Sequence, residues 1–330
     1  MTMTPDAWIP LIERLEAVLD RALARWPEPA GMDESALAYR YRRIQGQMVM
    51  EPIRHARALA WEQLQEIDAQ KSRFERNVLA FLAGFPANHM LLTGARGTGK
   101  SSLVKAAVLR WQAQGLRLVE VDKQDLLELP SLIDRLADRP ERFLVTCDDL
   151  SFEEGEAGYK ALKSVLDGSM ASPSDNLLIC ATSNRRHLLP ERVSDNLRMQ
   201  SSEDGELHPG EAVEEKISLS ERFGLWISFH PFDQREYLRI VASHLGAAGW
   251  TPGAIDAQRQ AALQWATARG SRSGRVAQQF AREAIGRRGL EALAPAGGAP
   301  SAADGAAPDF TSLTPAAHQE PPCPEGLDHV

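Results

Sequence analysis

One octapeptide, GARGTGKS at residues 94–101, fits the pattern GxxxxGK[ST] at every position. It follows an apolar run at 89–93 and precedes a helix-forming run, which is the strand–loop–helix setting that this pattern requires. Glycines in such a loop let successive backbone N–H groups converge on phosphate oxygens, and the N-terminus of the following helix adds partial positive charge. The sequence therefore predicts a phosphate-binding loop rather than a glycine-rich turn that fits by chance.

The side chains of this loop have separate expected tasks. Lys100 is expected to reach the β- and γ-phosphates of a nucleoside triphosphate, and the Ser101 hydroxyl is expected to ligate Mg²⁺. The residues predicted to contact the nucleotide here are Gly94, Ala95, Arg96, Gly97, Thr98, Gly99, Lys100, Ser101 and Ser102.

Five short apolar runs are separated by helical or polar segments. They are rich in Leu, Ile and Val and do not alternate with polar residues, which indicates strands that are buried on both faces. Strands that alternate with helices imply a parallel sheet in a three-layer α/β domain. The runs span residues 89–93, 117–121, 143–147, 177–182 and 225–229.

The third apolar run ends in two acids, Asp148 and Asp149, and the fourth is followed by Asn184. Since α/β sheets bind ligands outside the carboxyl ends of their strands, these side chains are expected beside the phosphate-binding loop. Asp148 would hold Mg²⁺, directly or through water, and Asp149 could orient and deprotonate the attacking water. The amide of Asn184 could reach the γ-phosphate and that water. The alternative is that all three residues simply begin surface loops.

Helical periodicity dominates on either side of these strands. Apolar residues spaced i, i+3, i+4 predict three helices before residue 85. Asp233, a good N-cap after Pro231, begins three more. The predicted helices span residues 7–26, about 33–50, about 53–83, about 233–247, about 254–268 and about 273–290.

These elements divide the chain into four predicted regions. A helical N-terminal region covers 1–85, the α/β domain covers 86–232 and a helical lid covers 233–292. Residues 293–330 are rich in Ala, Pro, Gly and Ser and have few large apolar side chains, which predicts a disordered tail. Within the α/β domain, the acidic segment 200–218 has few apolar residues and is predicted to be a mobile surface loop.

The cysteine and hydropathy patterns indicate a reducing compartment. Cys147 and Cys180 lie in apolar runs, Cys323 lies in a Pro-rich segment, and none belongs to a cluster with zinc-ligand spacing. No uncharged apolar run approaches about 18 residues, and no basic segment followed by an apolar one opens the sequence. These features predict a soluble cytoplasmic protein without a membrane partner.

Four motifs, GARGTGKSS, LVTCDDL, ICATSNR and SERFGL, occur in an order and spacing that resemble those of AAA+ ATPases. The resemblance covers about residues 67–289 and is strongest to a bacterial AAA+ family described as a domain of unknown function. It implies a five-stranded parallel sheet in the order 5-1-4-3-2, followed by a helical lid. It also implies that ATP binds with Mg²⁺ and is hydrolysed.

The same resemblance implies roles for individual residues. Asn184 is similar to the sensor 1 residue. Arg222 in SERFGL is similar to the arginine finger, which acts on the ATP of a neighbouring subunit, so a homo-oligomer is expected. Arg275 in GSRSGRVA resembles the sensor 2 arginine, and Arg272 is the competing candidate.

One departure from the AAA+ pattern concerns the second acid. Most AAA+ proteins have Asp-Glu where this chain has Asp148-Asp149, and the shorter side chain puts its reach to the attacking water in doubt. Glu153 or Glu154 could supply the base instead. The sequence therefore leaves open a slow ATPase used as a switch and a pseudo-ATPase that binds nucleotide as a structural element.

Two classes of partner compete. The first is an unidentified protein client that ATP turnover remodels or switches. The second is DNA, bound as by a helicase loader, and its main support is the run YRYRR at residues 39–43, because basic residues interleaved with aromatics can bind single strands. The formal net charge of −8 and the lack of a clear DNA-binding motif favour the protein client.

Overall fold

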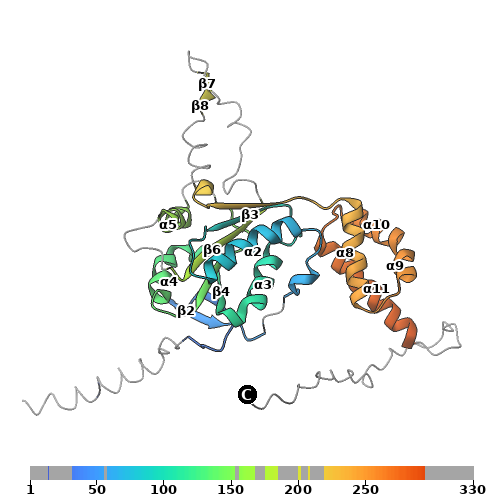
Figure 1. Ribbon diagram of the computed structural model, residues 1–330, viewed down its shortest axis with the longest axis horizontal. Coiled ribbons are helices and arrows are strands. Elements are labelled where there is room, and N and C mark those ends of the chain that lie inside the picture. Colours follow the sequence, from blue (N-terminus) through green and yellow to red (C-terminus); the bar gives the residue numbers. More distant parts are fainter. Residues whose placement is uncertain are drawn as a thin grey trace, which may run out of the picture. The chain divides into compact units, whose positions relative to one another are not determined.

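A seven-stranded, mostly parallel sheet organises the part of the chain that the computed structural model describes (Figure 1). The described residues are Arg14 and 32–293, without 56–57, 153–155, 168–174, 185–199, 202–206 and 209–218. The strand order is β2-β1-β4-β5-β6-β3-β9. The strands are β1 (Ala38–Ile44), β2 (Gln47–Pro52), β3 (Met90–Gly94), β4 (Leu116–Val121), β5 (Arg142–Cys147), β6 (Leu177–Ser183) and β9 (Leu225–Phe229).

Helices cover both faces of this sheet, and further helices follow β9 (Figure 1). Three short 3-10 helices, η2 (Trp61–Gln63), η3 (Gln112–Gln114) and η4 (Lys123–Glu128), lie in the connections. The α-helices are α2 (Asp68–Leu82), α3 (Lys100–Trp111), α4 (Leu129–Leu136), α5 (Ala157–Leu166), α8 (Gln234–Ala247), α9 (Pro252–Ala257), α10 (Arg259–Ala268) and α11 (Gly274–Leu293).

Two hydrophobic clusters, one on each face of the sheet, make the domain three-layered. In β3, Met90 and Leu92 belong to the cluster that packs on α2 and α3, while Leu91 belongs to the cluster that packs on α4 and α5. All three side chains are fully buried, which explains why this strand is apolar without alternation. Cys147 and Cys180 are likewise buried, as predicted, and carry free thiols.

The five predicted strands and the predicted fold class are confirmed. Taken in chain order, β3, β4, β5, β6 and β9 are parallel and lie in the order 5-1-4-3-2. Consecutive strands therefore cross over through helices, and all five carboxyl ends meet at one edge of the sheet. The phosphate-binding loop follows β3, which lies between β6 and β9.

The predicted helix over residues 33–50 is wrong. Residues 38–52 form an antiparallel hairpin whose first strand, β1, pairs in parallel with β4 and extends the sheet. Tyr39 and Tyr41 are buried and alternate with the more exposed Arg40 and Arg42, which is the period-two pattern of a half-buried strand. Gln45 and Gly46 both have positive φ, 49° and 85°, as a two-residue hairpin turn requires.

The hairpin removes the main support for a single-strand nucleic-acid site. The two tyrosine rings are buried in the core and cannot stack on bases. The three arginines of YRYRR each contact a carboxylate instead of standing free in solvent. The pairs are Arg40–Glu120 at 3.6 Å, Arg42–Glu51 at 2.8 Å and Arg43–Glu128 at 2.5 Å.

The other helical predictions have mixed outcomes. The helix expected over 53–83 is real only over Asp68–Leu82, so the N-terminal region 1–85 is not uniformly helical. The lid helices are confirmed, with the middle one divided into α9 and α10 at Gln258. Most of the predicted helix 7–26 and the predicted tail beyond Leu293 lie outside the described residues.

Two short pieces of the predicted loop 200–218 are described. Gln200–Ser201 (β7) and Leu207–His208 (β8) pair antiparallel with each other, apart from the main sheet. The rest of that predicted loop lies outside the described residues.

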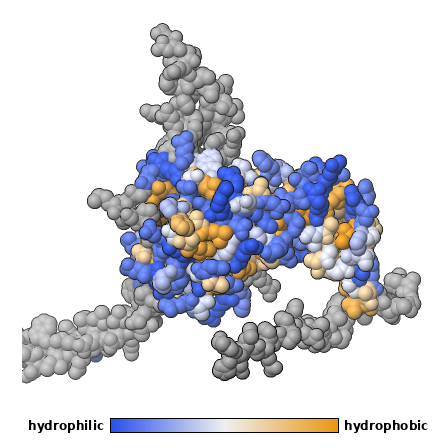
Figure 2. Space-filling view, viewed as in Figure 1, coloured by the Kyte–Doolittle hydropathy of each residue, from blue (hydrophilic) through white to orange (hydrophobic). Residues whose placement is uncertain are grey.

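None of the described helices is long and apolar enough to cross a membrane. The face shown in Figure 2 is mostly hydrophilic over the described residues, with smaller hydrophobic areas between.

A buried histidine predicts a pH-dependent stability. The Nδ1 atom of His89 accepts a hydrogen bond from the Ile179 backbone N–H at 3.1 Å, and burial lowers the pKa of His89 from 6.5 to about 4. The unfolded chain therefore binds one more proton between these values, and stability should fall as the pH drops from 6.5 to about 4, by about 3 kcal/mol in total.

The measurement is denaturant unfolding of wild type and His89→Asn between these pH values. Asparagine can still accept the N–H bond but does not titrate, so the difference between the two proteins isolates this histidine from the carboxylates that titrate in the same range. Parallel pH curves for the two proteins would contradict the assignment.

Candidate functional site

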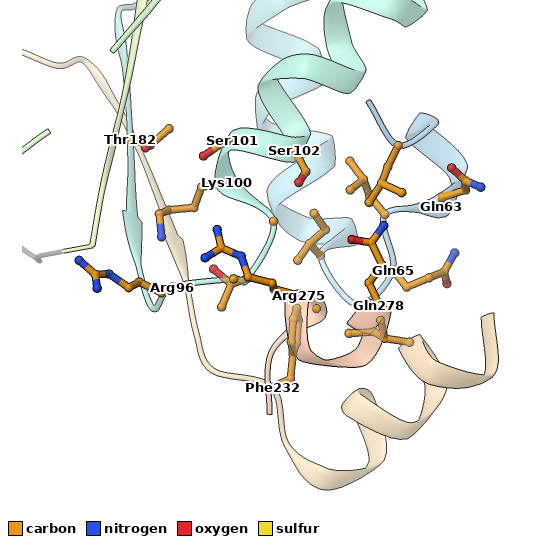
Figure 3. A pocket seen from close by; sticks show the side chains of 18 of the residues that line it. Gln63, Gln65, Arg96, Lys100, Ser101, Ser102, Thr182, Phe232, Arg275 and Gln278 are labelled. Carbon is orange, nitrogen blue, oxygen red and sulfur yellow. The ribbon is translucent and has the colours of Figure 1, made fainter. Parts of the chain in front are cut away.

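A cavity of about 490 Å³ lies at the carboxyl edge of the sheet. Its walls come from the loop before α3, the ends of β5 and β6, the segment before α2, and helices α8 and α11. Figure 3 shows Lys100, Ser101 and Arg275 on one side of it and Gln63, Gln65 and Gln278 on the other. Of the predicted site residues, those that line it are Arg96, Gly97, Thr98, Gly99, Lys100, Ser101, Ser102, Asp148, Asp149, Asn184 and Arg275.

The backbone of the loop needs glycine where it is most tightly packed. Gly94 has φ of 130°, and a Cβ atom there would lie 1.9 Å from the Phe229 carbonyl oxygen of the neighbouring strand. Gly97 has φ of 73°, and a Cβ atom would lie 2.8 Å from the Ser273 hydroxyl. These glycines let the loop turn back tightly enough to aim its N–H groups at a phosphate. Gly94 and Ala95 shape the loop without lining the cavity.

Lys100 is held at the centre of the loop. Its Nζ donates hydrogen bonds to the carbonyl oxygens of Gly94 at 2.8 Å and Ala95 at 2.9 Å, and to Oδ1 of Asn184 at 3.0 Å. Burial lowers the pKa of Lys100, an effect that the nearby carboxylate of Asp148 opposes. The ammonium group is therefore already placed at the loop before any phosphate arrives.

Asp148 is held next to the hydroxyl of Ser101. The Ser101 Oγ donates to Oδ1 of Asp148 at 2.5 Å, and the Thr182 Oγ1 donates to the same oxygen. A hydroxyl and a carboxylate in contact offer the oxygen ligands that Mg²⁺ takes together with substrate phosphates. The described residues contain no cluster of three or more His, Cys, Asp or Glu that could hold a metal on its own. The pair thus fits an ion that the nucleotide helps to bind.

Asp149 and Asn184 contact each other across neighbouring strand ends. The Asn184 Nδ2 donates to Oδ1 of Asp149, so the two ends of this amide touch both Lys100 and Asp149. Asp149 has φ of 53°, a left-handed conformation that Asp tolerates better than most residues, and its backbone N–H donates to Thr182 at 3.0 Å. Its other carboxylate oxygen lies 3.7 Å from Nη2 of Arg96.

The lid contacts the loop directly. The Gly274 N–H at the start of α11 donates to the Gly97 carbonyl oxygen at 2.8 Å, and this brings Arg275 to the cavity. Arg272 lines a second hollow on the other side of Phe232 and does not line the first. Of the two candidate sensor 2 residues, Arg275 therefore lies at the cavity beside the loop and Arg272 does not.

Arg222 stands apart from the other predicted site residues. It does not line the cavity of its own chain, and its Nε donates to the carboxylate of Asp167 at the end of α5. The Arg222 side chain is 25% exposed, so it is partly accessible from outside. Glu153 and Glu154, the alternative bases, lie outside the described residues.

A family model described as "Protein of unknown function (DUF815)" matches residues 34–288. The chain belongs to this family. The match includes the hairpin as well as the loop, the five parallel strands and α8–α10, so the DUF815 fold comprises more than the expected five-stranded core. No curated protein matches the sequence of this chain.

Several solved structures of AAA+ proteins resemble this DUF815 chain at low identity. A point mutant of RuvB from Thermotoga maritima is 15% identical over 71% of this chain and 66% of its own, with a TM-score of 0.47. ORC1 of Aeropyrum pernix in complex with DNA is 14% identical over 69% of this chain and 61% of its own, also with a TM-score of 0.47. A chain of the E. coli MS115-1 HORMA:CdnC:Trip13 complex is 13% identical over 67% of this chain and 89% of its own, with a TM-score of 0.42. This chain spans just under two thirds of the RuvB chain.

The sequence pattern missed the half of the cavity opposite Lys100. That half is lined by the segment before α2 and by residues of the lid, which the motifs do not mark. Trp61, Leu64 and Ile67 are buried at a spacing of three, which imitates helical periodicity, but the segment is a 3-10 turn followed by Glu66 at φ 63°. The missed lining residues are Leu59, Gln63, Leu64, Gln65, Ile67, Thr182, Phe232, Ile240, His244, Gly274 and Gln278.

Proposed function

We propose that this DUF815 protein binds ATP with Mg²⁺ in the cavity and hydrolyses it. The observation that carries the proposal is the convergence of three strand ends on one space. The loop after β3, the acids after β5 and the amide after β6 contact one another through Lys100, Ser101 and Asn184. A phosphate-binding loop beside a carboxylate–hydroxyl pair and a second carboxylate contains the parts that phosphoryl transfer to water needs.

The proposed reaction assigns each polar group one task. Ser101 and Asp148 would hold Mg²⁺, which supplies positive charge to the phosphates. Lys100 binds the β- and γ-phosphate oxygens. Asp149 accepts a proton from the attacking water while the oxygen of that water bonds to the γ-phosphorus. The bond between the γ-phosphorus and the β–γ bridging oxygen breaks, which gives ADP and inorganic phosphate. Asn184 orients the water.

We further propose that the protein acts as a homo-oligomer on a protein client. Arg222 lies outside its own cavity and is partly exposed, which suits a group that reaches the nucleotide of a neighbour. The contact between Gly97 and Gly274 joins the loop to the lid, so a change at the phosphates can move the lid. Such a movement could remodel or switch a partner.

The first test is nucleotide binding by Lys100→Ala. Removing the one ammonium group at the loop should raise the dissociation constant for a fluorescent ATP analogue by about 100-fold, since charge-assisted bonds to two phosphates are lost. The matched control is Lys105→Ala, which removes a lysine from the same helix that pairs with Glu120 at 3.1 Å outside the cavity. Equal dissociation constants for all three proteins would refute the proposed site.

A further inference from the structure

The cavity half opposite Lys100 is formed by two segments that are far apart in the sequence. One is the segment 59–67 before α2, which we call the far wall, and the other is the inner side of α8. Leu59, Leu64 and Ile67 come from the far wall, and Ile240 and His244 from α8. The apolar surfaces suit a planar base, so this half is where the nucleoside of the proposed ATP would lie.

An ion pair joins the far wall to α8 beside this space. The Arg239 Nε lies 2.5 Å from Oε1 of Glu66 and its Nη2 lies 2.7 Å from Oε2, so the guanidinium and the carboxylate are paired at both of their ends. Arg239 precedes Ile240, and Glu66 lies between Gln65 and Ile67; these three neighbours all line the cavity. The pair therefore fixes residues that touch the ligand space from both sides.

The backbone at Glu66 supports a role beyond surface charge. Its φ of 63° is unfavourable for a residue with a long side chain, and such conformations persist where the surroundings hold them. The Glu66 side chain is only 16% exposed, whereas that of Arg239 is 58% exposed. The turn thus points the Glu66 carboxylate at α8 and leaves the neighbouring Gln65 at the cavity.

We propose that Glu66 and Arg239 are positioning residues that hold the far wall against α8 and so set how long a nucleotide stays bound. The inference rests on the proposed function, because it concerns the cavity assigned to ATP. The lid contacts the phosphate-binding loop through the bond between Gly274 and Gly97. The ion pair also joins the lid helix α8 to the far wall, beside the half of the cavity assigned to the nucleoside. Without the pair, the far wall and α8 would be held together less firmly around the nucleoside, so the nucleotide would leave sooner.

The test is the release rate of a fluorescent ATP analogue from the full chain with Mg²⁺, chased with unlabelled ATP in a stopped-flow instrument. Glu66→Gln and Arg239→Gln should each release it about three- to ten-fold faster, because each removes a partly exposed two-point ion pair of modest strength. Association rates should change less than about twofold, since the pair does not block entry. Raising KCl from about 50 to about 300 mM should speed release from wild type by a larger factor than from either variant, because only wild type also has the ion pair to screen.

Two further proteins make the result decisive. The charge swap Glu66→Arg with Arg239→Glu should restore slow release, whereas Arg42→Gln, which breaks a 2.8 Å ion pair on the hairpin, should leave release unchanged. Equal release from wild type and both single variants, or no recovery in the swap, overturns the inference while leaving nucleotide binding intact. A wild-type chain that binds no analogue would instead refute the proposed function itself.

Discussion

Replacing Arg222 with alanine should leave ATP binding unchanged and lower ATP turnover by roughly 10³-fold. A guanidinium offers planar donors to the charge that develops on the γ-phosphate, and the alanine side chain offers none. Because Arg222 lies outside the cavity of its own chain, this loss requires that it act on a neighbour. Specific activity of the wild type should accordingly rise with protein concentration as oligomers form.

Mixing variants separates a finger from a structural arginine. Arg222→Ala keeps its phosphate-binding loop and Lys100→Ala keeps its Arg222, so a mixture of the two inactive proteins should recover part of the activity. The absence of recovery, together with activity that is independent of concentration, would leave a monomeric switch.

The ion pair with Asp167 provides the matched control. If Arg222 has only a structural role, Asp167→Asn and Arg222→Ala should each lower thermal stability slightly and neither should change turnover. If Arg222 is a finger, Asp167→Asn should keep turnover near the wild-type value while Arg222→Ala loses it. The comparison of kcat and Tm across the two variants therefore decides between the roles.

Asp149→Asn should bind ATP with unchanged affinity and hydrolyse it about 10²- to 10⁴-fold more slowly, because an amide cannot accept the proton of the attacking water. The side chain keeps nearly the same shape, so the loop around Lys100 should be undisturbed. The measurement is steady-state phosphate release beside equilibrium binding of the fluorescent analogue.

Asp149→Glu tests whether the length of the side chain limits its reach to the attacking water. It adds the methylene that most AAA+ proteins have at this position, and it should retain turnover if a carboxylate there is the base. Wild-type turnover in Asp149→Asn would move the base elsewhere, with Glu153 and Glu154 as the next residues to replace. A wild type that binds ATP tightly without releasing phosphate would identify a pseudo-ATPase.

Local sequence determined the parts of the protein in which a residue's type reflects a single requirement, either a backbone conformation or burial. Gly94, Gly97 and Gly99 adopt positive φ in a loop that only such a pattern can form, and Lys100 follows at the spacing that this loop fixes. The strands β3, β4, β5 and β6 lie inside the sheet and are largely buried, whereas β9 is at its edge and exposes Ser228; all five apolar runs could still be located in the sequence to within one or two residues. The strand order came from the resemblance, since the lengths of connections do not specify it.

The hairpin was visible in the sequence but was interpreted with the wrong period. Its alternating Tyr and Arg residues and the Gln45-Gly46 turn are strand signals, and they compete with apolar spacings that also fit a helix. Pairing with β4 decides between them, because the strand buries Tyr39 and Tyr41 against the sheet as a helix there could not. That contact spans about eighty residues of sequence, so no local pattern records it.

Tertiary structure alone decided what completes the cavity. Glu66 of the far wall and Arg239 of α8 are 173 residues apart, and only folding brings them together and places Gln65 at the same space as His244. The same holds for Arg275 and Arg222, which sequence motifs treat alike: the bond between Gly274 and Gly97 brings the first to the loop, whereas the second lies outside the cavity and contacts Asp167. Local pattern specifies backbone conformation and burial, whereas the meeting of two side chains depends on how whole elements pack.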